Sequence, residues 1–214
     1  GSLRLLQVLK LTFIVFFFED FEIKSLVEGL KNLTSLTALH LGLYINLDSN
    51  SKTLTALIDQ LQNCRKLQKI HLHLRDWMKY VDFNLTPLAL LLKDLEELVE
   101  INLYFGDHIT DAGLKILFES LKERNNLRVF ALNIGESVEP TDKSLLVLTS
   151  ILTNWSFLTD FMLSFNSCSR ITVQGVKTLC KALQNLQNLE LIKLDFLKCK
   201  ELNDKKIKAM LYGI

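Results

Sequence analysis

Three of the four histidines in this chain are the residues best suited to chemistry. His71 and His73 are two positions apart, so in an extended strand their imidazoles point to the same side of the sheet. His40 stands 31 residues before His71, an interval that recurs along the chain. Three imidazoles on one surface suit zinc coordination, an ordinary polar surface, or a binding surface that responds to pH. Since no carboxylate or cysteine occupies those strand positions, we predict no bound metal and no cofactor, and pH-sensitive binding stays open.

Patterns typical of catalysis are missing from the sequence. No phosphate-binding loop of the type G-x-G-x-x-G or G-x-x-x-x-G-K occurs. The sequence has no nucleophile elbow and no recognisable Ser–His–Asp arrangement. The acidic pair Glu96-Glu97 falls in a predicted helix-to-strand turn, where solvated side chains are expected. We therefore predict that the chain is not an enzyme and binds no small-molecule substrate.

Composition narrows the class of partner. The 214 residues include 25 basic and 24 acidic ones, with no long run of one sign. Such an even balance gives no general attraction to nucleic acid or to an anionic membrane. The most apolar stretch, residues 5–18, is interrupted by polar residues and is too short to span a bilayer. We predict a protein partner, with no nucleic acid and no membrane involved.

The four cysteines indicate a reducing compartment. None belongs to a C-x-x-C pair, which excludes the usual zinc-finger and thioredoxin patterns. Cys168 and Cys199 take the same place in adjacent repeats, so oxidation would bring a disulfide within reach, but reduced thiols are the expectation. We therefore expect an intracellular, cytoplasmic protein.

The strands that position these side chains come from a repeat. The pattern Leu-x-x-h-x-Leu-x-h, in which h is a bulky apolar residue, occurs seven times. Its last five residues alternate between apolar and variable types, which is the period of a strand with one buried face. The leading leucines, which follow one another at intervals of 29 to 31 residues, are Leu6, Leu36, Leu67, Leu98, Leu127, Leu158 and Leu189.

An amphipathic helix is predicted after each strand. Apolar residues recur at i, i+3, i+4 and i+7, as in Leu114-Leu117-Phe118-Leu121. Four residues before each such stripe we predict the helix N-cap, whose side-chain oxygen binds free backbone N–H groups. Of the seven positions, only Glu19 is a poor capping residue. The predicted caps are Asn50, Asn84, Thr110, Thr141, Thr172 and Asn203.

A strand and a helix thus alternate in one register along the chain, and such units stack side by side. We predict an α/β fold, a leucine-rich-repeat solenoid of about seven repeats in a horseshoe shape, with a parallel sheet on the concave face and helices on the convex face. One domain is predicted over residues 3–214, with residues 1–2 interpreted as the remnant of a tag. Because both ends are apolar where a solenoid needs polar caps, we expect the natural protein to be longer.

Two segments carry a family resemblance, residues 109–114 (ITDAGL) and residues 171–176 (ITVQGV). On these segments and the repeat, the chain resembles the ribonuclease-inhibitor-like class of leucine-rich repeats, in which every repeat has a full helix. That class usually places Asn or Cys three residues after the second strand leucine, where it binds the backbone of the turn. Only Asn166 matches, so the chain departs from the class at the inner turn.

The resemblance implies that partners are held on the concave face and its loop rims. The variable positions between the strand leucines form that face, which is polar with few charges and suits protein recognition. The third loop, residues 75–83, adds Trp77 and Tyr80 as rim candidates, with the alternative that Trp77 and Phe83 fold back to fill a gap. The predicted concave-face site consists of His40, His71, His73, Asn102, Tyr104, Asn133, Ser164, Lys193 and Asp195.

These patterns favour a scaffold or recognition module that binds a protein through the concave face and the loop rims. A fold by itself does not fix a function, so two alternatives stay open. One is a regulatory module such as an activator of a small GTPase. The other is the sensor domain of a larger multidomain signalling protein.

Overall fold

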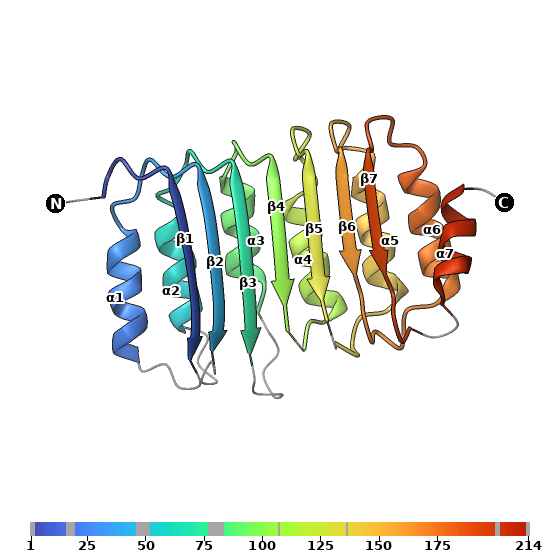
Figure 1. The fold of residues 1–214 in the computed structure, drawn as a ribbon, viewed down its shortest axis with the longest axis horizontal. Helices are drawn as coiled ribbons and strands as arrows, with labels where there is room; N and C mark the ends of the chain where they lie inside the picture. The colour runs from blue at the N-terminus through green and yellow to red at the C-terminus, as the bar shows by residue number, and fades with distance from the viewer. Residues whose placement is uncertain are drawn as a thin grey trace.

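The computed structural model describes residues 3–15, 20–45, 52–76, 84–106, 108–135, 137–199 and 202–212. Across these residues strands and helices alternate, and the strands form one parallel sheet in which the spatial order follows the chain (Figure 1). The elements are β1 (Val8–Val15), α1 (Asp20–Leu30), β2 (Ala38–Ile45), α2 (Lys52–Leu61), β3 (Lys69–Asp76), α3 (Thr86–Asp94), β4 (Glu100–Phe105), α4 (Asp111–Ser120), β5 (Val129–Ile134), α5 (Asp142–Leu152), β6 (Asp160–Ser164), α6 (Val173–Leu183), β7 (Leu191–Asp195) and α7 (Asp204–Tyr212).

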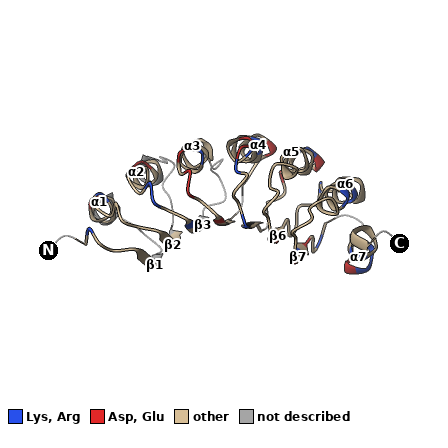
Figure 2. Ribbon diagram, turned by 90° about the horizontal axis from the view of Figure 1, so that it is seen from above, with Lys and Arg blue, Asp and Glu red and all other residues tan. Residues whose placement is uncertain are grey.

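The molecule is an arch with two layers. Seen from above, the helices form its outer layer and the strands its inner layer (Figure 2). This confirms the predicted α/β leucine-rich-repeat solenoid, with the sheet on the concave face and the helices on the convex face. Within the described ranges, no helix combines the length and the apolar character that crossing a membrane requires.

Equivalent residues of successive repeats lie beside one another in the sheet. Leu41 pairs with Leu72, and Leu72 pairs with Leu103, because the two repeat intervals are equal. The same register sets His40 beside His71, and His71 beside Asn102, on the opposite face. In-register stacking therefore sorts the apolar positions into the core and the variable positions onto the concave face.

The core fills the space between the sheet and the helices. Leu103 of β4 has an exposed fraction of only 2%, and the stripe of α4 that was predicted to face it is fully buried. Trp155 is also buried, and its indole N–H donates to the carbonyl of Leu121 at 3.0 Å. Arg124 takes the same repeat position as Trp155 and donates to the carbonyls of Leu92 and Lys93 at the end of α3. A side chain with an N–H group at this position thus donates hydrogen bonds to free carbonyls at the end of the helix in the preceding repeat.

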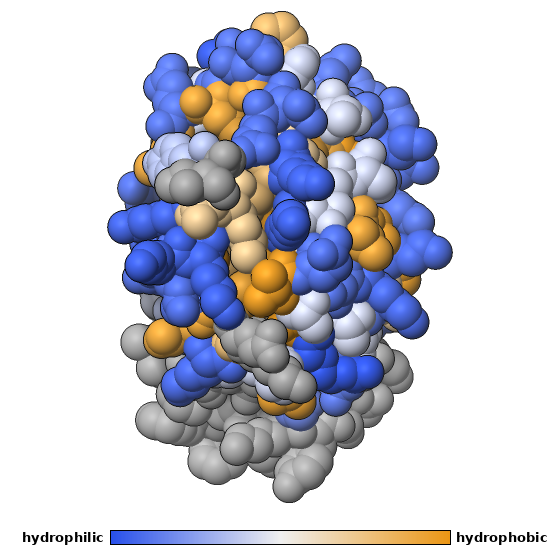
Figure 3. Space-filling view, turned by 90° about the vertical axis from the view of Figure 1, so that its right-hand side faces the viewer, coloured by the Kyte–Doolittle hydropathy of each residue, from blue (hydrophilic) through white to orange (hydrophobic). Residues whose placement is uncertain are grey.

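The last repeat is less covered than the inner ones. Ile192 and Leu194 on β7 are only partly buried, whereas Leu163 on β6 has an exposed fraction of 2%. Viewed from the end at which α7 lies, apolar side chains are interspersed with polar ones (Figure 3). Among the exposed apolar side chains of this repeat are Leu197 and Tyr212.

Most of the predicted helix caps are confirmed. The hydroxyls of Thr110, Thr141 and Thr172 accept hydrogen bonds from backbone N–H groups two or three residues further on. Asn203 caps α7 in the same way, by accepting from the N–H of Lys206. The caps predicted for the first three helices have other outcomes. The side chain of Asn84 accepts from the N–H of Thr86, but α3 begins one residue later than predicted, and Asn50 and Glu19 lie outside the described residues.

Aspartates at the helix starts link neighbouring repeats. One carboxylate oxygen of Asp111 accepts from the backbone N–H of Thr141 at 2.9 Å, and the other accepts from the hydroxyl of Thr141 at 2.6 Å. Asp142 makes the same two bonds to Thr172, at 2.8 and 2.6 Å. Each aspartate therefore fixes the residue that caps the next helix, a role that adds to its favourable interaction with the dipole of its own helix.

The strands of the first three repeats are longer than the later ones. β1, β2 and β3 have eight residues each, whereas β4 and β5 have six, and β6 and β7 have five. At the turn after β5, the side chain of Asn133 accepts from the N–H of Gly135, and after β7 Asp195 accepts from the N–H of Leu197. In these two repeats, the turn backbone is bound from a concave-face position, two residues before the place at which the resembled class carries Asn or Cys.

The four cysteines are free and buried. Burial raises the pKa of Cys64, Cys180 and Cys199 to about 11. The thiol of Cys199 lies 3.0 Å from the carbonyl oxygen of Phe165, in the repeat that contains Cys168. A raised pKa keeps these groups as thiols at neutral pH, so they are poor nucleophiles.

Candidate functional site in the concave groove

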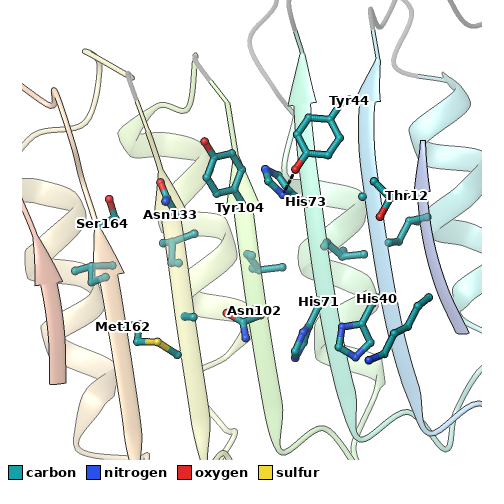
Figure 4. Close-up of a pocket in the computed structure, with 18 of the residues that line it drawn as sticks. Thr12, His40, Tyr44, His71, His73, Asn102, Tyr104, Asn133, Met162 and Ser164 are labelled. Carbon is teal, nitrogen blue, oxygen red and sulfur yellow. Dashed lines mark hydrogen bonds between the residues drawn. The ribbon is translucent and has the colours of Figure 1, made fainter. Parts of the chain in front are cut away.

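The inner face of the arch forms a groove of about 570 Å³ to which all seven strands contribute (Figure 4). The structure places every concave-face residue predicted from the sequence along this groove. Binding by them stays a prediction. The rim candidates Trp77 and Tyr80 lie outside the described residues, as does Phe83. The nine predicted residues in the groove are His40, His71, His73, Asn102, Tyr104, Asn133, Ser164, Lys193 and Asp195.

One cluster, centred on the carboxylate of Glu100, lies beside the groove, and its member His71 lines the groove. One carboxylate oxygen of Glu100 lies 2.6 Å from Nε2 of His71, and the other lies 2.9 Å from Nζ of Lys69. Glu100 is paired with Lys69 in the sheet register and reaches His71 diagonally. Burial alone would raise the pKa of Glu100, but hydrogen bonds from Lys69 and His71 lower it overall, so the carboxylate is charged at neutral pH.

His40 packs on this cluster from the neighbouring strand. The ring centroids of His40 and His71 are 4.0 Å apart, and the rings meet edge to face at 65°. The pKa of His40 is lowered, first by burial and then by the positive charges of His71, Lys10 and Lys69, while Glu100 acts against these effects. His40 is therefore a neutral imidazole at neutral pH in the free chain.

A second cluster consists of Tyr44, His73 and Tyr104. The hydroxyl of Tyr44 lies 2.6 Å from Nδ1 of His73, and the two ring centroids are 4.4 Å apart. Tyr104 lies on the other side of His73, with ring centroids 3.8 Å apart. The three rings come from β2, β3 and β4 and form a continuous surface, which we call the aromatic shelf.

Gly42 makes room for the aromatic shelf. A Cβ atom at this position would lie 3.2 Å from a methyl carbon of Thr12 and 3.5 Å from the ring of Tyr44. Gly42 is the register partner of His73, so a side chain here would compete with Tyr44 for the space beside the imidazole. The missing side chain on β2 thus lets Tyr44 lean toward β3.

The remaining groove residues are mainly polar and are held by local bonds. Asn133 and Asp195 bind the turn backbone as described above, and the hydroxyl of Ser164 also donates to Asp195 at 3.1 Å. Asn102 and Met162 lie between the histidine cluster and this end of the groove (Figure 4). Asn133 and Asp195 therefore stabilise the turns of the fold and also line the groove.

The predicted site did not include Tyr44, which lines the groove, or Lys69 and Glu100, which form the cluster with His71 beside it. These residues lie just outside the variable positions between the strand's apolar residues from which the site was predicted. The alternation of core-facing and concave-facing residues identifies them when it is extended by two residues along each strand. Lys69 is two residues before His71, and Tyr44 is two residues after Gly42, so both point to the concave face.

The histidines do not converge on one point. His71 turns toward Glu100, whereas His73 pairs with Tyr44 on the aromatic shelf. In the part of the chain that the structure describes, no group of three or more His, Cys, Asp or Glu side chains is arranged to hold a metal ion. The arrangement instead supplies hydrogen-bond donors and acceptors beside aromatic rings.

Comparisons with known proteins find matches among solved structures. No protein-family model matches the sequence, and no curated protein matches it. Among solved structures, the crystal structure of the Rad7 and Elc1 complex in yeast matches with 16% sequence identity and a TM-score of 0.33. The match covers 88% of this chain and 63% of the other, so this chain spans less than two thirds of that length. At this identity and TM-score the match indicates no partner, and the repeat fold rests on the strand order and register.

Proposed function

We propose that this chain is a protein-recognition module that binds its partner in the concave groove. The observation that carries the proposal is a groove across all seven strands, lined by aromatic and polar side chains. Tyrosine is enriched where proteins bind one another, because its ring gives contact area and its hydroxyl gives a hydrogen bond. Tyr44 and Tyr104 place two such rings at the centre of one half of the groove, beside His73.

The charge of the groove supports a protein rather than a nucleic acid. A nucleic-acid track needs repeated Lys or Arg side chains along its length. Among the side chains lining the groove, only Lys10 and Lys193 are of these types, and they belong to the first and last strands. Uncharged groups such as Asn102 and Ser164 occupy positions between them, which suits contacts with a polar protein surface.

The length of the helices supports a second part of the proposal, which concerns the class of leucine-rich repeat. Each repeat of the structure carries an α-helix of 9 to 11 residues, as the ribonuclease-inhibitor-like class of leucine-rich repeats requires. We extend the proposal to membership of that class, to a single solenoid domain over residues 3–214, and to the absence of catalysis. Action on a small GTPase, or a sensor role in a larger signalling protein, stays an alternative.

The test is affinity capture from a lysate with two matched variants. In the groove variant, His40, His71 and His73 are replaced by Ala. In the control variant, three exposed lysines of the convex helices are replaced by Ala. Circular dichroism first verifies that both variants fold. The three control positions are Lys115, Lys143 and Lys177.

We expect one protein to be recovered with the wild type and with the control variant, and to be lost with the groove variant. Recovery with all three would place the binding site outside the groove and contradict the proposal. Recovery of a nucleotide-loaded GTPase would favour the regulatory alternative. Failure of the wild-type chain to recover any protein would count against a recognition module.

A further inference from the structure

Basic side chains gather at one end of the groove. Lys10 on β1, His40 on β2 and His71 on β3 are register partners that line the groove, and Lys69 lies two residues before His71 on β3. We call these four residues the basic end. The rings of His40 and His71 are in contact, so the cluster is compact.

Among the described residues, one carboxylate contacts this cluster, and each of its oxygens already has a partner. Glu100 gives one oxygen to His71 and the other to Lys69. Within the described residues, neither Lys10 nor His40 has an ion pair. The basic end therefore has more positive groups than its single acid can neutralise.

Most of the charged groups around His40 are positive. Lys10 from β1, and Lys69 and His71 from β3, oppose a proton on its ring, and Glu100 from β4 favours one. Burial adds to the opposition, and the net effect lowers the pKa of His40. A second carboxylate beside Lys10 and His40 would offset the repulsion and raise that pKa again.

We propose that the basic end binds carboxylate side chains of an acidic segment of the partner protein, seated between Lys10 and His40. This inference rests on the proposed function, because it names the chemistry of the partner that the groove takes. The aromatic shelf lies beside the site, since Tyr44 is on the same strand as His40 and also lines the groove. An acidic segment with an apolar or aromatic neighbour thus finds both a charge and a ring surface.

The composition of the groove favours carboxylate over phosphate. The difference lies in charge. Glu100 already pairs with Lys69 and His71. His40 is neutral in the free chain, so Lys10 is the charge that remains for a ligand. One positive charge matches the single negative charge of a carboxylate better than the charge of about −1.5 to −2 on a phosphate group.

Binding of this kind is linked to pH. In the free chain His40 is neutral at pH 7, because its pKa lies below the ordinary value of 6.5. A bound carboxylate favours the protonated ring, so binding takes up a proton. Affinity therefore rises as the pH falls toward that pKa, as long as the carboxylates of the partner stay ionised.

The experiment uses fluorescein-labelled hexaglutamate as the probe and fluorescence anisotropy as the readout. We expect binding by the wild-type chain that is tighter at about pH 6 than at about pH 8. Lys10→Gln weakens binding about threefold, as for the loss of one partly exposed ion pair. Lys177→Gln, at an exposed position of the convex helix α6 outside the groove, is the control and leaves the affinity unchanged.

Two further variants separate charge from structure. His40→Gln removes the pH dependence, and Glu100→Gln strengthens hexaglutamate binding, because it removes the competing carboxylate. A purely structural role for Glu100 predicts the opposite result. Equal loss with Lys10→Gln and Lys177→Gln, or no detectable binding by the wild type, overturns the inference.

A phosphoserine peptide of the same length tests the other anion. Tighter binding of that peptide than of hexaglutamate, lost with Lys10→Gln, overturns the choice of carboxylate. The proposed function fails independently, through the affinity capture. If the groove variant loses its protein partner but hexaglutamate does not bind to the wild type, the proposal of a binding groove is supported. The inference that the partner binds through an acidic segment is then wrong.

Discussion

The hydroxyl of Tyr44 and Nδ1 of His73 lie 2.6 Å apart and join the second and third strands across the floor of the groove. Which of the two atoms donates depends on the tautomer of the imidazole. Tyr44 is not the register partner of His73 but reaches it diagonally, over Gly42. This bond fixes the aromatic shelf on which the proposed recognition depends.

Loss of the Tyr44 hydroxyl should weaken the fold slightly. We expect Tyr44→Phe to lower the free energy of unfolding by about 1 kcal/mol, because one hydrogen bond is lost while the ring remains. Urea denaturation followed by circular dichroism measures the change. Tyr104→Phe is the control, since no hydrogen bond of its hydroxyl is found among the described residues. A loss with Tyr104→Phe as large as that with Tyr44→Phe would contradict this explanation.

Removal of the Asp111 carboxylate should weaken the contact between α4 and α5. Asp111→Ala removes the hydrogen bonds with the N–H and the hydroxyl of Thr141 and with the hydroxyl of Ser144. We expect the free energy of unfolding to fall by about 2 kcal/mol, because bonds to a charged group are lost and a half-buried donor group remains. Asp204→Ala is the matched control, because Asp204 is exposed, and we expect a change below about 0.5 kcal/mol.

The contribution of Asp111 should depend on pH. Burial opposes ionisation, but hydrogen bonds from Ser144 and Thr141 outweigh it and lower the pKa below the ordinary 3.8. The stabilisation is therefore complete above pH 3.8 and is lost as the pH falls through the lower value of the folded state. Unfolding curves of the wild type and of Asp111→Ala should converge in strong acid. A constant difference at every pH would mean that the carboxylate charge contributes nothing.

Two glycines at the same place in their helices should respond differently to alanine. A Cβ on Gly175 would lie 2.3 Å from a carboxylate oxygen of Asp142, which Thr172 holds in place. A Cβ on Gly113 would instead meet Leu85 at 3.4 Å, an ordinary contact. We expect Gly175→Ala to lower the melting temperature, by overpacking worth about 1 kcal/mol or more.

For Gly113→Ala we expect no loss, and a gain of up to about 1 kcal/mol from the helix preference of alanine. Differential scanning calorimetry of the two variants checks both values. If they shift the melting temperature equally, the carboxylate of Asp142 does not restrict the position of Gly175.

The two faces of β4 provide the most direct test of the register. Leu103 is buried in the core, and Leu103→Asp should prevent folding, because a charge would be buried without a partner. Tyr104 is half-exposed in the groove, and Tyr104→Ser should cost at most about 1 kcal/mol while weakening partner binding. Far-UV circular dichroism separates the two outcomes. A stable Leu103→Asp variant would mean that the faces of the strand are inverted.

The repeat by itself was enough to predict the fold and nine of the residues that line the groove. Leu72 and Leu103 belong to the core because apolar residues alternate along each strand. His71 and Asn102 share the opposite face because the repeat interval aligns them. Local periodicity and equal spacing fix these features, since stacking of equal units allows one parallel register. The caps Thr110 and Thr141 follow from the same spacing.

Contacts between groove side chains were decided only by the tertiary structure. Glu100 reaches His71, and Tyr44 reaches His73, along diagonals between strands, which depend on side-chain direction and on free space such as that over Gly42. The sequence placed the histidines on one face, but their separation into a charged cluster and an aromatic shelf needed the three-dimensional arrangement. The physical reason is the separation along the chain. Alternation relates neighbouring residues of one strand, whereas these pairs join residues 29 positions apart.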